Sequence, residues 1–472
     1  MVWFRVAGAP QSRTEWESNV LRLQANDLPL RAAATTDPAR GVVPDVCVIG
    51  AGSSGMTVAK ALHQRGVVFD CFEKGSDIGG MWRYENDNGQ SSAYASLHID
   101  TSRKNLGYSD FPIPDDMPDF LSHAKFLEYL ENYANHFEVR ERVTFGTVVE
   151  AVRQAPDGRW NVHLSTGEIR NYGNVVVANG HLWDPRTPVF PGEFRGETTH
   201  SHYYRTAAPF EGKSVLVVGL GNSAVDIAVD LARRARSVTM STRRSAWIMP
   251  KYLMGYPVDQ WSRFLSRRLR LPTPLTRKIM SKLIRLGVGD QRRFGLKRPE
   301  HPMWREHATL SQELLPYLGH GWISMKPNIS RMDGNEIAFE DGSRQVFDAV
   351  VFATGYKTTF PFLDRNTFDA ETDTTNLYRR MVSLKHPGLI FAGLVQPVGP
   401  TIPLVEIQGR WLAAVLSGDI ALPEHEVQVR EVEQHKQYQR QTYLDADRYV
   451  LEVDFRTYAA QMNADMRRKP AR

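Results

Sequence analysis

The sequence predicts an α/β protein with two dinucleotide-binding, Rossmann-like domains, the second inserted into the first. Two glycine-rich fingerprints support this prediction: one follows the apolar run VCVI and opens at Gly50, and the other follows SVLVV and opens at Gly219. Each precedes a segment of helical pattern and then another apolar strand, which is the order of a dinucleotide-binding unit. The length of 472 residues also favours two or three domains.

The first fingerprint, GAGSSG, places glycines at Gly50, Gly52 and Gly55. These positions allow a tight turn, close approach of a pyrophosphate, and close packing of helix against strand. The strand that follows ends at Glu73, near the ~20-residue distance expected for an acid that binds ribose hydroxyls. A carboxylate there repels a 2′-phosphate, so this site should bind an unphosphorylated adenosine such as that of FAD or NAD.

The second fingerprint, GLGNSA, has alanine at the third position, where a methyl group is still small enough for close packing. Its second strand ends in two arginines instead of an acid, and guanidinium groups match phosphate oxygens in pairs. We therefore expect an NADPH site. Its candidate residues are Gly219, Gly221, Ser223, Thr242, Arg243 and Arg244.

Composition excludes several other classes of protein. The chain is 42% hydrophobic and 24% charged with a net charge of +5, as in a globular protein, and the charge alone does not favour nucleic-acid binding. No apolar run reaches the ~18 residues of a membrane span, so we expect a cytoplasmic protein. The two cysteines, Cys47 and Cys71, lie in expected strands and should be buried and reduced, and the histidines lack metal-ligand spacing.

The expected domain boundaries follow from these motifs. Residues 1–43 form an N-terminal extension, 44–198 the first part of the FAD domain, 199–329 the NADPH domain, and 330–472 the second part of the FAD domain. Within the extension, Trp16, Val20 and Leu23 have helical spacing. This segment is either an arm, which suggests a homodimer, or a partly disordered tail.

A basic insert lies between Arg243 and Arg298. It contains 15 lysines and arginines against two acids, Asp259 and Asp290, interleaved with large apolar residues. Such a segment is either a solvated helical cap whose cations steer NADPH or a surface that contacts an anionic membrane peripherally.

Further motifs resemble those of the flavin-containing monooxygenases. Between the fingerprints, Phe194, Gly196, His200 and Tyr204 match FxGxxxHxxxY, and the tyrosine stands where the related Baeyer-Villiger enzymes typically have tryptophan. The resemblance continues through IGGMWRY at 78–84, FATGY at 352–356 and QPVGPTIPLVEIQGRW at 396–411.

The resemblance implies that NADPH reduces FAD, that the reduced flavin and oxygen give a 4a-hydroperoxyflavin, and that this species oxygenates nitrogen or sulfur in small lipophilic substrates. It places Gly80, Met81, Trp82 and Gln396 near the flavin ring. It also implies a hinge or cofactor-positioning role for the FxGxxxH and FATGY segments, where His200 and Tyr204 are candidate catalytic residues. The alternative for His200 alone is a satisfied linker histidine.

One departure from the family pattern bears on function: Asp100 stands where an asparagine is usual. An ionised aspartate only accepts hydrogen bonds. Asp100 could hold an arginine against the flavin, as in Baeyer-Villiger relatives, or pair locally with Arg103 or a backbone amide. Ketone oxygenation is therefore an alternative activity, and a non-oxygenating NADPH–flavin oxidase or reductase is a second one.

Overall fold

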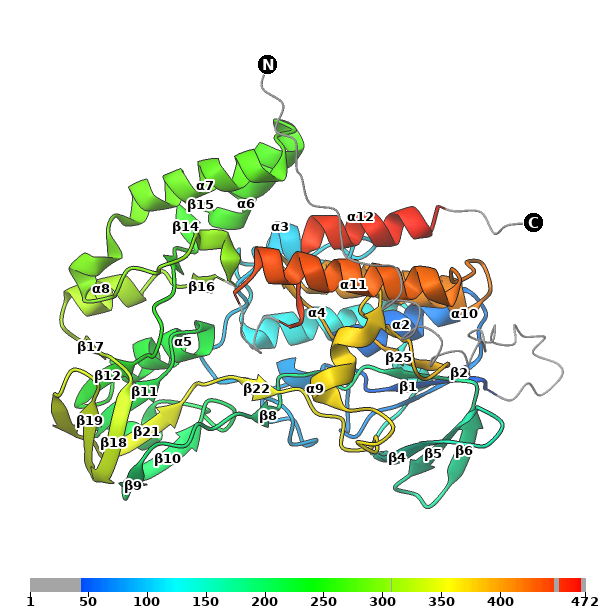
Figure 1. The fold of residues 1–472 in the computed structure, drawn as a ribbon, viewed down its shortest axis with the longest axis horizontal. Helices are drawn as coiled ribbons and strands as arrows, with labels where there is room; N and C mark the ends of the chain where they lie inside the picture. The colour runs from blue at the N-terminus through cyan, green and yellow to red at the C-terminus, as the bar shows by residue number, and fades with distance from the viewer. Residues whose placement is uncertain (1–43, 307, 445–449, 468–472) are drawn as a thin grey trace, which may run out of the picture.

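The computed structural model describes residues 44–306, 308–444 and 450–467. The expected N-terminal extension lies outside these residues. The described chain forms two α/β units side by side, each built around a sheet with parallel strands (Figure 1).

The first sheet has β1 at its centre, between β7 and β2, and its antiparallel strands lie at one edge. The buried run at β1 is expected for a strand covered on both faces. Across the sheet, the strands are β23 (Leu377–Tyr378), β24 (Val382–Ser383), β25 (Leu389–Phe391), β7 (Asn174–Val177), β1 (Val46–Ile49), β2 (Phe69–Phe72) and β3 (Val143–Thr144). Cys47 and Cys71 are free and buried in β1 and β2, as predicted.

The second sheet is parallel throughout, and β11 lies at its centre. Its strands are β10 (Glu197–His200), β21 (Ala349–Phe352), β11 (Ser214–Val218), β12 (Ser237–Ser241) and β17 (Ile323–Lys326). Strand β21 lies beyond residue 329, where the NADPH domain was expected to end, yet it pairs with β11.

Helices α2 (Ser53–Gln64) and α10 (Ile402–Leu416) pack against each other over the first sheet. A Cβ at Gly409 would lie 2.7 Å from the carbonyl oxygen of Thr57, so only glycine permits this approach of the two helices. The segment after residue 388 thus returns to the first unit, as expected. Helix α5 (Asn222–Leu231) follows β11 in the second unit.

The basic insert contains α6 (Val258–Arg263), a π-helical turn at Phe264–Arg268 and α7 (Thr273–Val288). Its apolar side chains form a small separate core that includes Trp247, Met249 and Met280. Figure 1 shows α7 at the edge of the second unit, away from its sheet.

The remaining elements form the edges of the two units. A turn at Asp341–Gly342 joins β19 (Glu336–Phe339) to antiparallel β20 (Arg344–Val346), and Gly342 has φ +79°. Other strands are β4 (Val149–Gln154), β5 (Trp160–Leu164), β6 (Ile169–Tyr172), β8 (Asp184–Pro185), β9 (Gly192–Phe194), β13 (Ile248–Met249), β14 (Tyr252–Leu253), β15 (Tyr256–Pro257), β16 (Thr309–Leu310), β18 (Ile329–Gly334), β22 (Tyr356–Lys357), β26 (Gln396–Val398) and β27 (Glu452–Asp454). Other helices are α3 (Arg103–Leu106), α4 (His123–His136), α8 (Leu314–Gly319), α9 (Ala370–Asp373), α11 (His425–Thr442) and α12 (Phe455–Asp465).

Candidate nucleotide and active sites

The first glycine loop joins β1 to α2. The amide of Gly50 donates to the carbonyl of Phe72 at 2.8 Å, and Gly50 has φ +103°. A Cβ at Gly55 would lie 1.8 Å from the Gly50 carbonyl oxygen, whereas one at Gly52 would approach no described atom closer than 3.7 Å. Gly50 and Gly55 are therefore required by the loop itself, and Gly52 leaves an open approach to the N-terminus of α2.

The second glycine loop repeats this geometry between β11 and α5. The amide of Gly219 donates to Ser241 at 2.9 Å, and its φ is +135°. A Cβ at Gly219 would lie 2.4 Å from the carbonyl oxygen of Ala353. In the first loop, a Cβ at Gly50 would likewise lie 2.7 Å from the carbonyl oxygen of Ala178. Ala224 is fully buried at the third position, so the predicted exchange of glycine for alanine is sterically accommodated.

The two helices that follow these loops begin without a side-chain cap. Gly52 is the N-cap of α2 and Gly221 is the N-cap of α5, and neither residue can supply a capping oxygen. Ser223 lies in the first turn of α5. Unpaired amides at a helix N-terminus favour an anion, so both loops fit the pyrophosphate of a dinucleotide.

Glu73 follows β2 and closes onto the first glycine loop. Its carboxylate accepts hydrogen bonds from the amide of Ala51 at 2.8 Å, the amide of Gly75 at 2.9 Å and Nδ2 of Asn88 at 3.1 Å. The side chain is buried. Glu73 therefore fixes the shape of the loop, and its expected role as a ribose ligand stays a prediction.

Arg243 and Arg244 follow β12 at the corresponding place in the second unit. Both are exposed, and in the described part of the chain neither guanidinium forms an ion pair. The Thr242 hydroxyl donates to the Arg244 carbonyl at 2.6 Å, which turns the chain at the end of the strand. Two cations without acidic partners fit a 2′-phosphate.

Gly80, Met81 and Trp82 form a short 3₁₀ turn beside the first glycine loop. The amide of Gly79 donates to Ala51 at 3.2 Å, and a Cβ at Gly80 would lie 3.0 Å from Cα of Gly52. Gln396 lies in β26, three residues after Gly393, whose missing Cβ would clash with Ser54 at the start of α2. The structure thus brings the Gly80–Trp82 turn and Gly393 to the N-terminal end of α2, and Gln396 follows Gly393 in the chain.

The two connections between the units pair with each other. Strands β8 and β22 are antiparallel, and β10 is parallel to β21 with His200 opposite Phe352 (Figure 1). The His200 ring contacts the Tyr356 ring edge-on at 5.4 Å between centroids, and its Nδ1 accepts the amide of His202. Burial, reinforced by the charge of His202, lowers the pKa of His200 to about 4, so His200 is neutral at pH 7.

Tyr204 lies in the apolar core of the second unit. Its hydroxyl donates to Asp230 at 2.6 Å, and its ring contacts Tyr94 and Phe210. Burial, with the Asp230 hydrogen bond, raises the pKa of Tyr204. These are the contacts of a packing residue, and the catalytic role expected for Tyr204 stays a prediction.

Asp100 pairs with a lysine of the basic insert. Its Oδ1 lies 3.0 Å from Nζ of Lys251, which follows β13, and the two side chains are 25% and 15% exposed. Arg103, the local partner considered from the sequence, instead pairs with Asp115 and lies 3.9 Å from Asp119. Asp100 thus joins the first unit to the insert through Lys251, and among the described residues it pairs with neither an arginine nor a local partner.

A second carboxyl group shares this region. Asp226, on α5, accepts the hydroxyl of Tyr94 at 2.8 Å. Burial, followed by repulsion from Asp100, raises the pKa of Asp226 to about 7, while Lys251 opposes the shift. Tyr94, Asp226 and Lys251 were not predicted from the sequence, since their patterns are those of ordinary core and surface residues.

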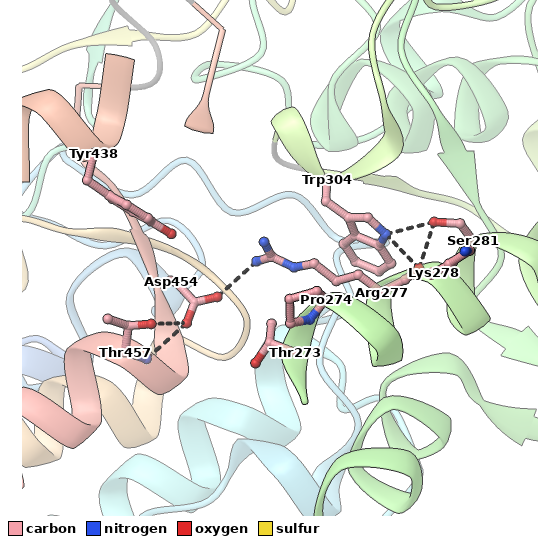
Figure 2. Close-up of a pocket in the computed structure, with 9 residues that line it drawn as sticks. All are labelled: Thr273, Pro274, Arg277, Lys278, Ser281, Trp304, Tyr438, Asp454 and Thr457. Atoms are coloured by element: carbon pink, nitrogen blue, oxygen red, sulfur yellow. Dashed lines mark hydrogen bonds and ion pairs between the residues drawn. The ribbon is translucent and has the colours of Figure 1, made fainter. Parts of the chain in front are cut away.

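A cavity of about 520 Å³ lies between α7, Trp304 and the C-terminal helices (Figure 2). Arg277 crosses it to Asp454 at 2.9 Å, and the Trp304 ring lies beside Arg277. Asp454 belongs to β27, which pairs with the strand of Gln396. Neither glycine loop lines this cavity, so it is separate from both nucleotide sites.

Two glycine loops of matched geometry, with an acid at one and cations at the other, define a two-nucleotide oxidoreductase. The chain belongs to the flavin-binding monooxygenase-like family, whose model matches residues 44–471. It is 35% identical over 432 residues to flavin-containing monooxygenase 5 of Rattus norvegicus, covering 87% of this chain and 80% of the relative. It is 33% identical to the N-oxide-forming dimethylaniline monooxygenase 2 of the same organism, covering 91% and 84%.

Solved structures share the fold. The S-allyl-L-cysteine S-oxygenase of Allium sativum superposes with a TM-score of 0.66 at 26% identity, covering 89% of this chain and 88% of that enzyme. An open cyclohexanone monooxygenase superposes with a TM-score of 0.67 at 19% identity, covering 89% and 97%. The family match confirms the predicted flavoprotein monooxygenase and its flavin cofactor, and the superpositions confirm the predicted fold class. Among the described helices, none is long and apolar enough to cross a membrane.

Proposed function

We propose that this enzyme oxygenates nitrogen or sulfur atoms of small lipophilic substrates with NADPH and oxygen. The observation that carries the proposal is the pairing of two matched glycine loops with opposite charges at their second strands, Glu73 in one and Arg243 with Arg244 in the other. The named activities of the relatives, N-oxide formation and S-oxygenation, support this substrate class.

The first unit would hold FAD. Gly50, Gly52 and Gly55 offer the end of α2 to its pyrophosphate, and Glu73 lies at the expected place for its ribose. Gly80, Met81, Trp82 and Gln396 would lie toward the flavin ring. When bound, the flavin supplies the redox and oxygen chemistry, and the protein positions it and excludes water.

The second unit would hold NADPH through Gly219, Gly221 and Ser223, with Thr242, Arg243 and Arg244 at the 2′-phosphate. We place the boundaries of this inserted unit at about residues 197 and 352, because β10 and β21 both belong to its sheet. The paired strands β8 and β22 fit a hinge, in which neutral His200 packs on Tyr356.

The direct test compares NADPH consumption with product formation on methyl phenyl sulfide and on dimethylaniline. We expect one sulfoxide or N-oxide per NADPH oxidised, with little hydrogen peroxide. NADPH oxidation that yields only hydrogen peroxide would instead support the oxidase or reductase alternative and refute the proposal.

A second candidate function, ketone oxygenation, is favoured by the Asp100–Lys251 pair, since a carboxylate held by a cation replaces the usual asparagine. The Asp100→Asn variant should lose ketone oxygenation and keep sulfoxidation. Equal loss of both activities would refute this role of Asp100.

The cytoplasmic location, the homodimer and the peripheral membrane contact suggested by the basic insert remain predictions. The insert does expose apolar side chains among its cations, including Met254, Phe264 and Leu286. A flotation assay with anionic and neutral vesicles would separate a membrane contact from a solvated cap.

A further inference from the structure

The junction between the two units contains two carboxyl groups and one lysine. Asp100 comes from the first unit, Asp226 from α5 behind the second glycine loop, and Lys251 from the basic insert. Tyr94, whose ring packs in the core of the second unit, completes the group by donating to Asp226. The cluster therefore forms only where three separate parts of the chain meet.

The charges of this cluster do not balance when both carboxyl groups are ionised. One ammonium then faces two carboxylates, and the buried surroundings strengthen their repulsion. One proton on the pair removes the excess charge. Besides burial, the charges of Asp100 and Glu313 raise the pKa of Asp226, while the cation Lys251 and the hydrogen bond from Tyr94 lower it.

We propose that Lys251 and Asp226 are positioning residues for the Asp100 carboxylate at the junction of the two units, Lys251 through its ion pair and Asp226 by staying protonated. In this arrangement Lys251 binds Asp100, and protonated Asp226 avoids repelling it. Loss of the proton above about pH 7 weakens the junction, because a second negative charge then lies near Asp100. The consequence for catalysis rests on the proposed role of Asp100.

The proposal is tested by hydrogen–deuterium exchange of residues 90–105 in the full-length holoenzyme, measured below and above pH 7 and corrected for intrinsic exchange. In the wild type we expect protection to fall above pH 7, by up to about tenfold per pH unit if this proton limits opening. The asparagine of Asp226→Asn keeps an oxygen that can accept from Tyr94, but its side chain cannot ionise. Protection of residues 90–105 in this variant should therefore not change with pH.

Lys251→Met should move the loss of protection to higher pH, because Lys251 favours ionisation of both carboxyl groups, and Lys251→Arg should restore the wild-type profile. Asp259→Ala is a matched control at the same junction. Asp259 accepts the amide of Ser102 at 2.9 Å, and alanine removes this acceptor, so the variant should lose protection without losing the pH dependence.

A wild-type profile in Asp226→Asn, or an unmoved transition in Lys251→Met, would overturn the proposal. The exchange measurement needs no turnover, so its outcome is separate from that of the proposed function. If exchange behaves as expected, the pH profile of kcat/KM for a ketone should lose its inflection near pH 7 in Asp226→Asn. An inflection retained in that variant would overturn the link to Asp100.

Discussion

The Ala51 amide donates a 2.8 Å hydrogen bond to the Glu73 carboxylate, so the acid that follows β2 fixes the glycine loop that follows β1. The two residues follow neighbouring parallel strands, whose carboxyl ends meet at one edge of the sheet. Glu73 therefore stabilises the glycine loop in addition to its proposed role in selecting the nucleotide.

Glu73→Ala should destabilise the protein and lower its flavin content. The change leaves three donors, those of Ala51, Gly75 and Asn88, without their acceptor, and each unsatisfied buried group costs about 1–3 kcal/mol. Thermal unfolding and the flavin-to-protein absorbance ratio measure both effects. Glu193→Ala, at an exposed position, is the control, and wild-type stability in Glu73→Ala would contradict the role of Glu73 in the loop.

Substitutions at two glycines of the first loop should have different effects, one on cofactor binding and the other on folding. Gly52→Ala should fold normally but bind FAD weakly, since its Cβ meets nothing within 3.7 Å and instead occupies the approach of the phosphate. Gly55→Ala should disrupt the loop even without FAD, because its Cβ would lie 1.8 Å from the Gly50 carbonyl oxygen. Thermal unfolding of the two apoproteins distinguishes them, and equal stability would refute this assignment.

The glycine spacing was sufficient to predict these loops because each position has a local steric cause. The first glycine needs a positive φ, and the third must pack against its own loop. The alanine at the third position of the second loop, Ala224, was predictable because its methyl group is small enough for the same close packing. The extent of the second sheet was not predictable, since the pairing of β21 with β11 joins distant segments that carry no local signal.

Arg243 and Arg244 should determine the preference for NADPH over NADH. Replacing either by alanine should raise KM for NADPH by roughly tenfold or more, because each charge-assisted hydrogen bond contributes about 1.5–3 kcal/mol, and should leave KM for NADH nearly unchanged. Arg236→Ala is the matched control, since Arg236 lies at the other end of β12 and pairs with Asp348. An equal loss with both nucleotides would show that the arginines do not bind the 2′-phosphate.

The sequence predicted Asp100 as an informative residue but not its partner. Lys251 is one of 15 cations in the insert, and no spacing rule distinguishes it from the others. Asp226 and Tyr94 lie in segments whose apolar neighbours predict only core packing. The cluster depends on how the units dock, which periodicity along the chain does not encode.

The buried His435 should make the protein less stable in acid. Burial, with the charge of Arg380, lowers the pKa of His435 from 6.5 to about 3 in the folded state. Between these values the unfolded chain binds a proton that the folded protein does not, so stability is full above pH 6.5 and falls as pH decreases. His435→Gln cannot titrate at this position. Between pH 7 and about pH 4 its unfolding free energy should therefore decline by about 3 kcal/mol less than that of the wild type. Urea unfolding across this pH range measures how the unfolding free energy changes with pH. The difference between wild type and variant above pH 7, where His435 is neutral in both states, serves as the baseline. Parallel stability curves for the two proteins would show that His435 is not the group responsible.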